Sequence, residues 1–151
     1  MTPLDILAKV NHHHVVITGG EPLNYNLDEL FMTLMGRFIQ VETSGQRKLK
    51  GTLKPSWLTW SPKPNLNWKA PEEFKWLVDE IKFVVDEELT YEIICRVVDD
   101  FTFANRVGVQ IVLMPEGCPP TKESMQKAFA LVMENPGWRF SDRLQWRLEV
   151  K

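Results

Sequence analysis

The sequence predicts an α/β fold built on a mainly parallel sheet. Short apolar runs rich in β-branched residues alternate with segments whose apolar residues recur at helical spacing. Strands separated by helices are typical of βαβ units, in which neighbouring strands run parallel. Four of the expected strands also end in loops rich in glycine, proline and polar residues: TGGEP, ETSG, SPKP and MPEG. Because parallel sheets place their binding sites at the carboxyl ends of the strands, these loops predict one site at one edge of the sheet.

The first half of the chain is expected to contain two helices and three strands. Leu4–Val10 has apolar residues at helical spacing, and the Thr-Pro pair before it supplies a cap and a first helical residue. His14–Thr18 is an apolar, β-branched run that ends at two glycines, which indicates a buried strand. Leu27–Met35 again has helical spacing, with Asn26 as a candidate cap. Two further apolar runs are expected to be strands: Phe38–Glu42 and Trp57–Trp60.

The second half continues the alternation of helices and strands. A proline suits the first turn of a helix over Pro71–Trp76, and the apolar run that follows indicates a strand over Glu80–Val85. A helix is then expected over Leu89–Val98, and Glu123 favours the N-terminus of the last helix. The remaining elements are a strand over Val109–Leu113, that last helix over Thr121–Met133, and Gln145–Val150 as a final strand or an extended cover.

Composition limits the classes of function. A chain of 151 residues fits one domain that can bury a core. Its formal net charge of −2 gives no basic signature for binding nucleic acid. No apolar run approaches the ~20 residues of a membrane-spanning helix, and the N-terminus does not have the pattern of a signal peptide. We therefore expect a cytoplasmic protein with neither a nucleic-acid partner nor a membrane partner.

Two groups of side chains invite a metal hypothesis that their spacing does not favour. Cys95 and Cys118 are 23 positions apart, and neither has a Cys or His at short ligand spacing. We expect both to be reduced thiols rather than zinc or cluster ligands. Three consecutive histidines, at positions 12 to 14, enter the first strand. Their side chains point in alternating directions, so they cannot all bind one ion.

The TGGEP loop carries the most distinctive chemistry. Gly19 and Gly20, directly after a strand, allow a sharp turn and a close approach of the backbone to a ligand. Glu21 then supplies a carboxylate that could pair with an ammonium group, and Pro22 stiffens the turn. An ordinary tight turn is the alternative. The loop is neither a P-loop, because it lacks the Lys-Ser/Thr pair, nor a GxGxxG motif.

Several motifs together give a more specific resemblance. VVITGGEPL, VETSG, SPK, DEIKFVVD, LMPEG and RLQWRLEV occur in this order from about His14 to the last residue. In order and spacing they resemble the 7-carboxy-7-deazaguanine synthase family of radical S-adenosylmethionine enzymes. The GGEP element alone is shared by many radical S-adenosylmethionine proteins, whereas its combination with SPK, EIKFVV and MPEG is much narrower.

The resemblance implies a fold, a reaction and a set of cofactors. The fold would be a shortened (β/α)6 barrel. The reaction would convert 6-carboxy-5,6,7,8-tetrahydropterin to 7-carboxy-7-deazaguanine with loss of ammonia, on the route to queuosine and other deazapurines. The family uses S-adenosyl-L-methionine, a [4Fe–4S] cluster and Mg²⁺, and these groups carry the difficult chemistry while the protein positions and shields.

The resemblance also assigns roles to residues of this chain. Thr18 would contact the pterin substrate, and Glu42, Thr43, Ser44 and Lys151 would line the same site. The residues that would contact S-adenosylmethionine are Gly20, Glu21, Ser61, Pro62, Lys63, Met114, Pro115, Glu116 and Gly117. Simpler roles stay open for some of them: a turn for the SPK loop, a salt-bridge partner for Glu42 and core packing for Met114. Tryptophans at positions 57, 60, 68 and 76 could stack on a pterin ring or fill core positions.

The sequence departs from the family at the cluster. The CxxxCxxC motif that holds it is absent, and with it the expected first strand, the cluster loop and the Mg²⁺ ligand. We therefore expect a single truncated core domain over 1–151, a partial (β/α)6 barrel that does not turn over substrate by itself. The exposed edge of its first strand predicts a homodimer, unless a separate chain supplies the missing segment. The alternative is a degenerate, non-catalytic module that binds S-adenosylmethionine or a partner.

Overall fold

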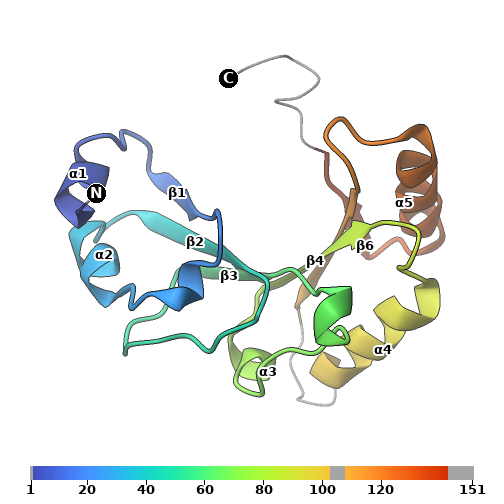
Figure 1. Ribbon diagram of the computed structural model, residues 1–151, viewed down its shortest axis with the longest axis horizontal. Coiled ribbons are helices and arrows are strands. Elements are labelled where there is room, and N and C mark those ends of the chain that lie inside the picture. Colours follow the sequence, from blue (N-terminus) through green and yellow to red (C-terminus); the bar gives the residue numbers. More distant parts are fainter. Residues whose placement is uncertain (1, 103–107, 143–151) are drawn as a thin grey trace.

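The computed structural model describes residues 2–102 and 108–142, and a six-stranded, all-parallel open sheet forms its centre (Figure 1). The strands lie in chain order across the sheet, so each strand pairs with the strands next to it in sequence. They are β1 (His14–Ile17), β2 (Phe38–Thr43), β3 (Trp57–Trp60), β4 (Glu80–Val85), β5 (Gln110–Pro115) and β6 (Trp138–Phe140). The predicted α/β architecture with a parallel sheet is confirmed.

The helices follow the expected alternation with shifted boundaries. The α-helices are α1 (Pro3–Leu7), α2 (Asp28–Thr33), α3 (Phe74–Leu77), α4 (Tyr91–Thr102) and α5 (Lys122–Glu134), and the 3-10 helices are η1 (Pro22–Asn24) and η2 (Pro64–Leu66). Thr2 caps α1 and Thr121 caps α5 through their hydroxyl groups. At α2 the cap position is Leu27, while Asn26 Oδ1 accepts a hydrogen bond from the backbone N–H of Asp28. The two threonines show how local capping chemistry sets where a helix begins.

The structure contains one strand that the sequence pattern did not predict, and one expected strand is not tested. The sequence pattern did not predict β6, because a three-residue strand with an arginine at its centre is too short to show a period. The expected element over Gln145–Val150 lies outside the described residues. Between β2 and β3 the chain forms a loop, where no helix was expected. Asp28 anchors this loop by accepting hydrogen bonds from the backbone N–H groups of Thr52 and Leu53, which hold the pKa of its carboxyl below the ordinary value.

The helices cover one face of the sheet, which carries the core. In Figure 1 they lie along the outer side of the curved sheet. Alternate strand residues point to this side and are buried, including Ile39 and Val41 of β2 and Phe83 of β4. They form one cluster with apolar helix and loop residues: Phe31, Leu34, Phe74, Leu89, Ile94, Val97, Phe101 and Ala128. Burying each large apolar side chain stabilises the fold by about 1.5–3 kcal/mol, so this face fixes the register of the strands.

The other strand residues form a polar inner face. Gln40 and Glu42 of β2 alternate with the buried residues of that strand and are half-buried, as are Glu80 and Lys82 of β4. A sheet that is apolar on one face and polar on the other leaves the polar face available for water or a ligand. None of the helices in the described part of the chain has both the length and the apolar composition needed to cross a bilayer.

Candidate functional site

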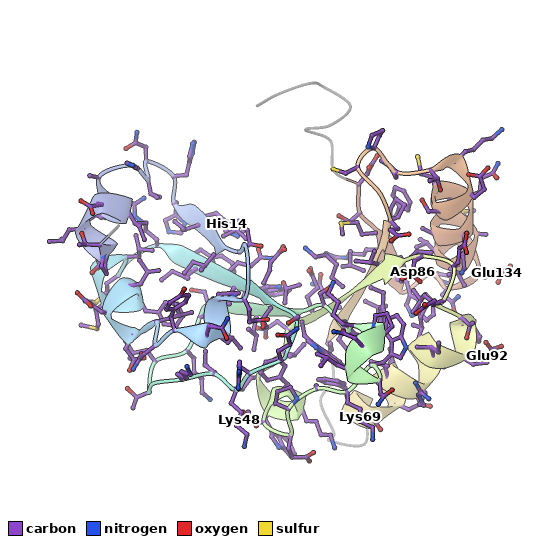
Figure 2. The ribbon with its side chains drawn as sticks, viewed as in Figure 1. His14, Lys48, Lys69, Asp86, Glu92 and Glu134 are labelled. Carbon is purple, nitrogen blue, oxygen red and sulfur yellow. The ribbon has the colours of Figure 1, made fainter. Side chains whose placement is uncertain are left out.

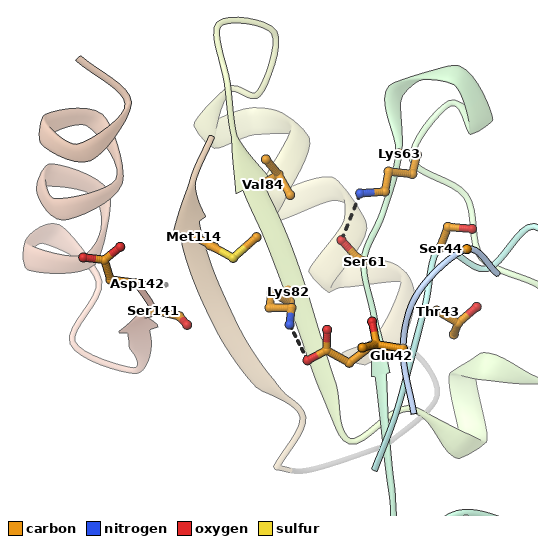
Figure 3. Close-up of a pocket in the computed structure, with 12 residues that line it drawn as sticks. Glu42, Thr43, Ser44, Ser61, Lys63, Lys82, Val84, Met114, Ser141 and Asp142 are labelled. Carbon is orange, nitrogen blue, oxygen red and sulfur yellow. Dashed lines mark hydrogen bonds and ion pairs between the residues drawn. The ribbon is translucent and has the colours of Figure 1, made fainter. Parts of the chain in front are cut away.

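A pocket opens at the carboxyl ends of the strands, on the polar face of the sheet (Figure 3). Its volume is about 380 Å³, within the roughly 300–1,000 Å³ of small-molecule sites. Residues that directly follow β1, β2, β3 and β6 contribute to it, together with residues of β2, β4 and β5. The lining consists of Thr18, Gly20, Glu42, Thr43, Ser44, Ser61, Lys63, Lys82, Val84, Met114, Ser141 and Asp142.

The structure brings most of the residues singled out in the sequence into this pocket. The eight that line it are Thr18, Gly20, Glu42, Thr43, Ser44, Ser61, Lys63 and Met114. They come from all four of the loops that follow predicted strands or from the strand ends themselves. The sequence pattern therefore predicted residues that share one pocket at this edge of the sheet, while the role of each residue toward a ligand stays a prediction.

The other residues singled out lie elsewhere. Pro62 and Pro115 are buried and support the loops rather than lining the pocket. Glu116 lines a different cavity, with Asp86 and Lys127. Gly117 has a φ of 103°, and a Cβ atom there would come within 2.8 Å of the Pro119 carbonyl oxygen, so this glycine is needed for the turn itself. The candidate Lys151 lies outside the described residues.

Glu21 is occupied by protein donors rather than exposed in the pocket. Its Oε1 accepts hydrogen bonds from the Leu23 backbone N–H at 3.1 Å and from the Thr43 hydroxyl at 2.6 Å. Its Oε2 accepts from the Ser44 backbone N–H at 3.0 Å and from the Ser44 hydroxyl. A carboxylate has about four lone-pair positions, so these four donors use them all. The carboxylate thus ties the end of β1 to the end of β2.

The hydrogen bonds to Glu21 also determine its ionisation. Burial alone would raise the pKa of Glu21, but the donors from Ser44, Thr43 and Leu23 outweigh it and hold the pKa below the ordinary value. The carboxyl is therefore ionised at neutral pH. Its negative charge is held behind Thr43 and Ser44, which line the pocket, by the backbone and hydroxyl groups around it.

Lys82 and Val84 also line the pocket, from the inner face of β4, although the motif analysis did not single them out. Lys82 Nζ lies 2.5 Å from Glu42 Oε1, and the two side chains are only 15% and 26% exposed. In Figure 3 they point toward each other across β3, with Val84 and Met114 beside them. The alternation within EIKFVV could have located Lys82, because the residues on either side of it, Ile81 and Phe83, are buried in the core.

Deeper on the same face, four strands each contribute a polar side chain to a hydrogen-bonded series. It begins at His14 on the edge strand β1 (Figure 2) and ends at Glu80 on β4. His14 Nε2 lies 3.0 Å from Gln40 Oε1, and Gln40 Nε2 donates to the Thr59 hydroxyl at 3.0 Å. Thr59 in turn donates to Glu80 Oε1 at 3.2 Å. We call this series the polar ladder.

Burial raises the pKa of Glu80, the last residue of the polar ladder. The hydrogen bond from Thr59 and the positive charges of Lys82 and Arg139 act in the opposite direction, and the negative charge of Glu42 acts in the same direction as burial. Partial burial of the carboxylate raises its pKa by more than these favourable neighbours lower it. Acidic and basic side chains therefore lie next to one another on the inner face, at the bottom of the pocket.

The described residues do not form a metal centre. Within 2–102 and 108–142 there is no group of three or more His, Cys, Asp or Glu residues that could hold a metal ion. Cys95 is half-buried on α4, and Cys118 is exposed in the loop after β5. Iron–sulfur clusters are usually held by four cysteines, so the two thiols of this chain do not fit as the ligand set.

Comparison with known proteins gives relatives of one kind. No protein-family model matches the chain. A 7-carboxy-7-deazaguanine synthase of Synechocystis sp. is 32% identical over 136 residues, which are 84% of this chain and 57% of that protein. The synthase of Aquifex aeolicus is also 32% identical over 136 residues (85% and 59%), and that of Buchnera aphidicola is 42% identical over 89 residues (56% and 39%). The resemblance seen in the motifs is confirmed as homology, although the chain spans less than two thirds of the length of these relatives.

Proposed function

Starting from this homology to 7-carboxy-7-deazaguanine synthases, we propose that the chain forms the S-adenosylmethionine and pterin site of such an enzyme. The reaction is the conversion of 6-carboxy-5,6,7,8-tetrahydropterin to 7-carboxy-7-deazaguanine with release of ammonia. The observation that carries the proposal is the convergence of Thr18, Gly20, Ser61, Lys63 and Met114 on one pocket. These residues come from separate motifs of the sequence and meet only in the folded chain.

The sheet is part of a (β/α)6 barrel under this proposal, and 1–151 acts as a single core domain. Three features support it: strands in chain order, helices on one face and a pocket at the carboxyl ends. The inner face of a barrel is its centre, which agrees with the polar side chains on that face of this sheet. The same arrangement in an open sheet leaves that centre accessible from one side.

The residues of the pocket fit S-adenosylmethionine by their chemistry. Hydroxyls of Ser61 and Ser44 and the ammonium of Lys63 suit its ribose and carboxylate, and the side chain of Met114 suits its adenine. Lys63 Nζ lies 3.3 Å from Ser61 Oγ, so the two polar groups are already gathered on one loop. When bound, S-adenosylmethionine supplies the radical chemistry of this enzyme class. The protein residues bind it, orient it and keep water from the face lined by Val84 and Met114.

The two cysteines of this chain do not fit as the ligands of the [4Fe–4S] cluster that the family uses. We therefore assign no step of the reaction to a cluster held by this chain. The chain by itself should not cleave S-adenosylmethionine. Anaerobic reconstitution with iron and sulfide, followed by an assay for deoxyadenosine, tests this expectation, and clear deoxyadenosine formation would contradict it.

Calorimetric titration with S-adenosylmethionine tests the proposed site. We expect saturable binding to the wild-type chain, and Ser61→Ala combined with Lys63→Met to weaken it by about tenfold or more. Lys75→Met is the matched control, since Lys75 of α3 pairs with Glu72, just before that helix, at 3.0 Å and does not line the pocket. Absence of binding to the wild-type chain, or an equal loss with the control, would refute the proposal.

A second candidate is a non-catalytic module that keeps the same pocket. The cysteine content favours it, because a chain with two cysteines has no complete cluster ligand set. Both candidates bind S-adenosylmethionine, so binding does not separate them. Turnover after mixing with a cysteine-containing partner chain from the same source would support the enzyme, and continued inactivity would support the module.

A further inference from the structure

The inner face of the sheet contains one polar pair whose hydrogen-bonding capacity is largely unused. Within the polar ladder, the Gln40 amide and the Thr59 hydroxyl are engaged with neighbouring strands. In the pocket above it, the only hydrogen bond of the Lys82 ammonium among the described residues is to Glu42. An ammonium has three donors and a carboxylate about four acceptor positions. Two donors of Lys82 and both lone pairs of Glu42 Oε2 therefore remain for a ligand.

The surroundings of this pair define the shape of its ligand. Both side chains line the pocket, and their low exposure shields them from bulk water. Val84 and Met114 lie beside them on neighbouring strands and form an apolar wall (Figure 3). A flat ring can place its face against the Val84 side of this wall, while the thioether of Met114 remains for the adenine of S-adenosylmethionine. Its edge then meets the Lys82–Glu42 pair.

The geometry points to a 2-amino-4-oxopyrimidine edge as the group that the Lys82–Glu42 pair recognises. Such an edge presents a carbonyl oxygen, a ring N–H and an amino group in a row. Lys82 Nζ donates to the carbonyl oxygen, and the free oxygen of Glu42 accepts from the ring N–H and the amino group. Pterins and deazaguanines share this edge, so one pair of residues reads both the substrate and the product. This inference rests on the proposed function, which supplies the pterin.

The pair is suited to this edge more than to a carboxylate. A lone cation would favour an anion, but the Lys82 charge is balanced by Glu42 at 2.5 Å. A carboxylate placed at Lys82 would also approach Glu42, and like charges in a shielded site repel. A neutral edge with an acceptor beside two donors matches both partners without this repulsion.

The test compares two ligands that differ only at this edge. 6-Carboxypterin has the 2-amino group, and 6-carboxylumazine carries an oxygen in its place. We expect fluorescence titration of the wild-type chain to show about 10- to 100-fold tighter binding of the pterin, because the carbonyl of the lumazine leaves a Glu42 acceptor facing an oxygen. Glu42→Gln should remove most of this preference, and Lys82→Met should weaken the pterin. Glu72→Gln and Lys75→Met, at an ion pair outside the pocket, serve as controls and should keep the preference.

The outcomes separate this inference from the proposed function. Equal binding of the two ligands to a wild-type chain that binds S-adenosylmethionine would overturn the edge assignment and leave the proposed function standing. A Lys82→Met variant that binds both ligands as tightly as wild type would show that Lys82 does not contact the carbonyl oxygen they share, which also overturns it. A wild-type chain that binds neither S-adenosylmethionine nor the pterin would refute both. The ligand comparison on the wild-type chain does not depend on any variant folding.

Discussion

At the scale of single residues, the carboxylate of Glu21 is an intramolecular tie whose strength depends on its charge. Glu21→Gln keeps the shape of the side chain but removes its charge and one pair of acceptor positions. The hydrogen bonds that Ser44 and Thr43 donate are therefore weakened or lost. We expect the variant to lose about 1–3 kcal/mol of unfolding free energy at neutral pH, a range that allows for the partial exposure of the group.

The pH dependence of this loss follows from the lowered pKa of Glu21. A lowered pKa in the folded state stabilises the fold above the ordinary pKa of glutamate, and the contribution is lost as pH falls through the lowered value. The difference in unfolding free energy between wild type and Glu21→Gln should therefore be largest near neutral pH and disappear in acid. Urea unfolding across this range measures it, with Glu88→Gln in an exposed turn as the control. A gap that stays constant with pH would contradict the tie.

Glu80 should show the opposite dependence, because its pKa is raised. The unfolded chain loses this proton at a lower pH than the folded chain, so ionisation destabilises the fold as pH rises from the ordinary to the raised pKa. Glu80→Gln keeps an oxygen that can accept from Thr59 and avoids the buried charge. We expect the variant to be more stable than wild type at about pH 8 and to lose this advantage toward about pH 4. A variant less stable than wild type at every pH would show that the attraction of Lys82 and Arg139 outweighs burial.

At the scale of elements, the turn after β2 depends on a glycine packed against an aromatic ring. Gly45 has a φ of 78°, and a Cβ atom there would come within 2.6 Å of Trp60 Nε1. That nitrogen donates to the Ser44 carbonyl oxygen at 3.1 Å, and the ring of Trp60 stacks on Phe101. The loop that carries Thr43 and Ser44 into the pocket is thus set by contact with the core.

Substitution of this glycine should cost more than backbone strain alone. Gly45→Ala displaces the Trp60 ring, whereas Gly36→Ala has the same unfavourable φ with open space around it. We expect Gly36→Ala to lose about 1–2 kcal/mol and Gly45→Ala to lose roughly 1–3 kcal/mol more. Gly137→Ala, which has neither constraint, should be close to neutral. Thermal unfolding with near-UV circular dichroism measures the series, and equal losses at positions 36 and 45 would contradict the contact with Trp60.

The elements also show what could be predicted from the sequence. Five strands and the edge at which their loops meet were recognisable, because apolar runs and glycine or proline punctuation are local signals. The partners of Glu21 were not, since Thr43 and Ser44 approach it only through strand pairing. Lys82 could have been placed on the inner face by alternation, but its pairing with Glu42 crosses β3 and has no local signal. The strand β6 was too short to be recognised, and the pocket residues after it were missed with it.

At the scale of the whole molecule, no strand among residues 2–102 and 108–142 pairs with the outer edge of β1, where the order of strands begins. Val16 on this strand is 46% exposed, so the edge combines free backbone groups with an apolar side chain. We propose that two copies of the chain associate through it.

Light scattering after size exclusion tests this association. We expect the wild-type chain to elute as a dimer or larger species, and Val16→Lys to shift it toward the monomer by placing a charge on the edge. Met133→Lys introduces the same charge at an exposed apolar position on α5, far along the sheet, and should not change the assembly. A wild-type chain that remains monomeric at high concentration would contradict the proposal.

The order of the strands has a consequence for how the chain reaches this structure. Because each strand lies beside the one made just before it, every pairing joins segments that are close in sequence. The sheet can therefore grow one strand at a time from β1 as synthesis proceeds, without waiting for a distant segment to arrive. This order avoids the longer crossovers of a sheet that pairs distant strands, so each step closes a smaller loop than in such a sheet. The pocket is completed last, when Ser141 and Asp142 follow β6 into place.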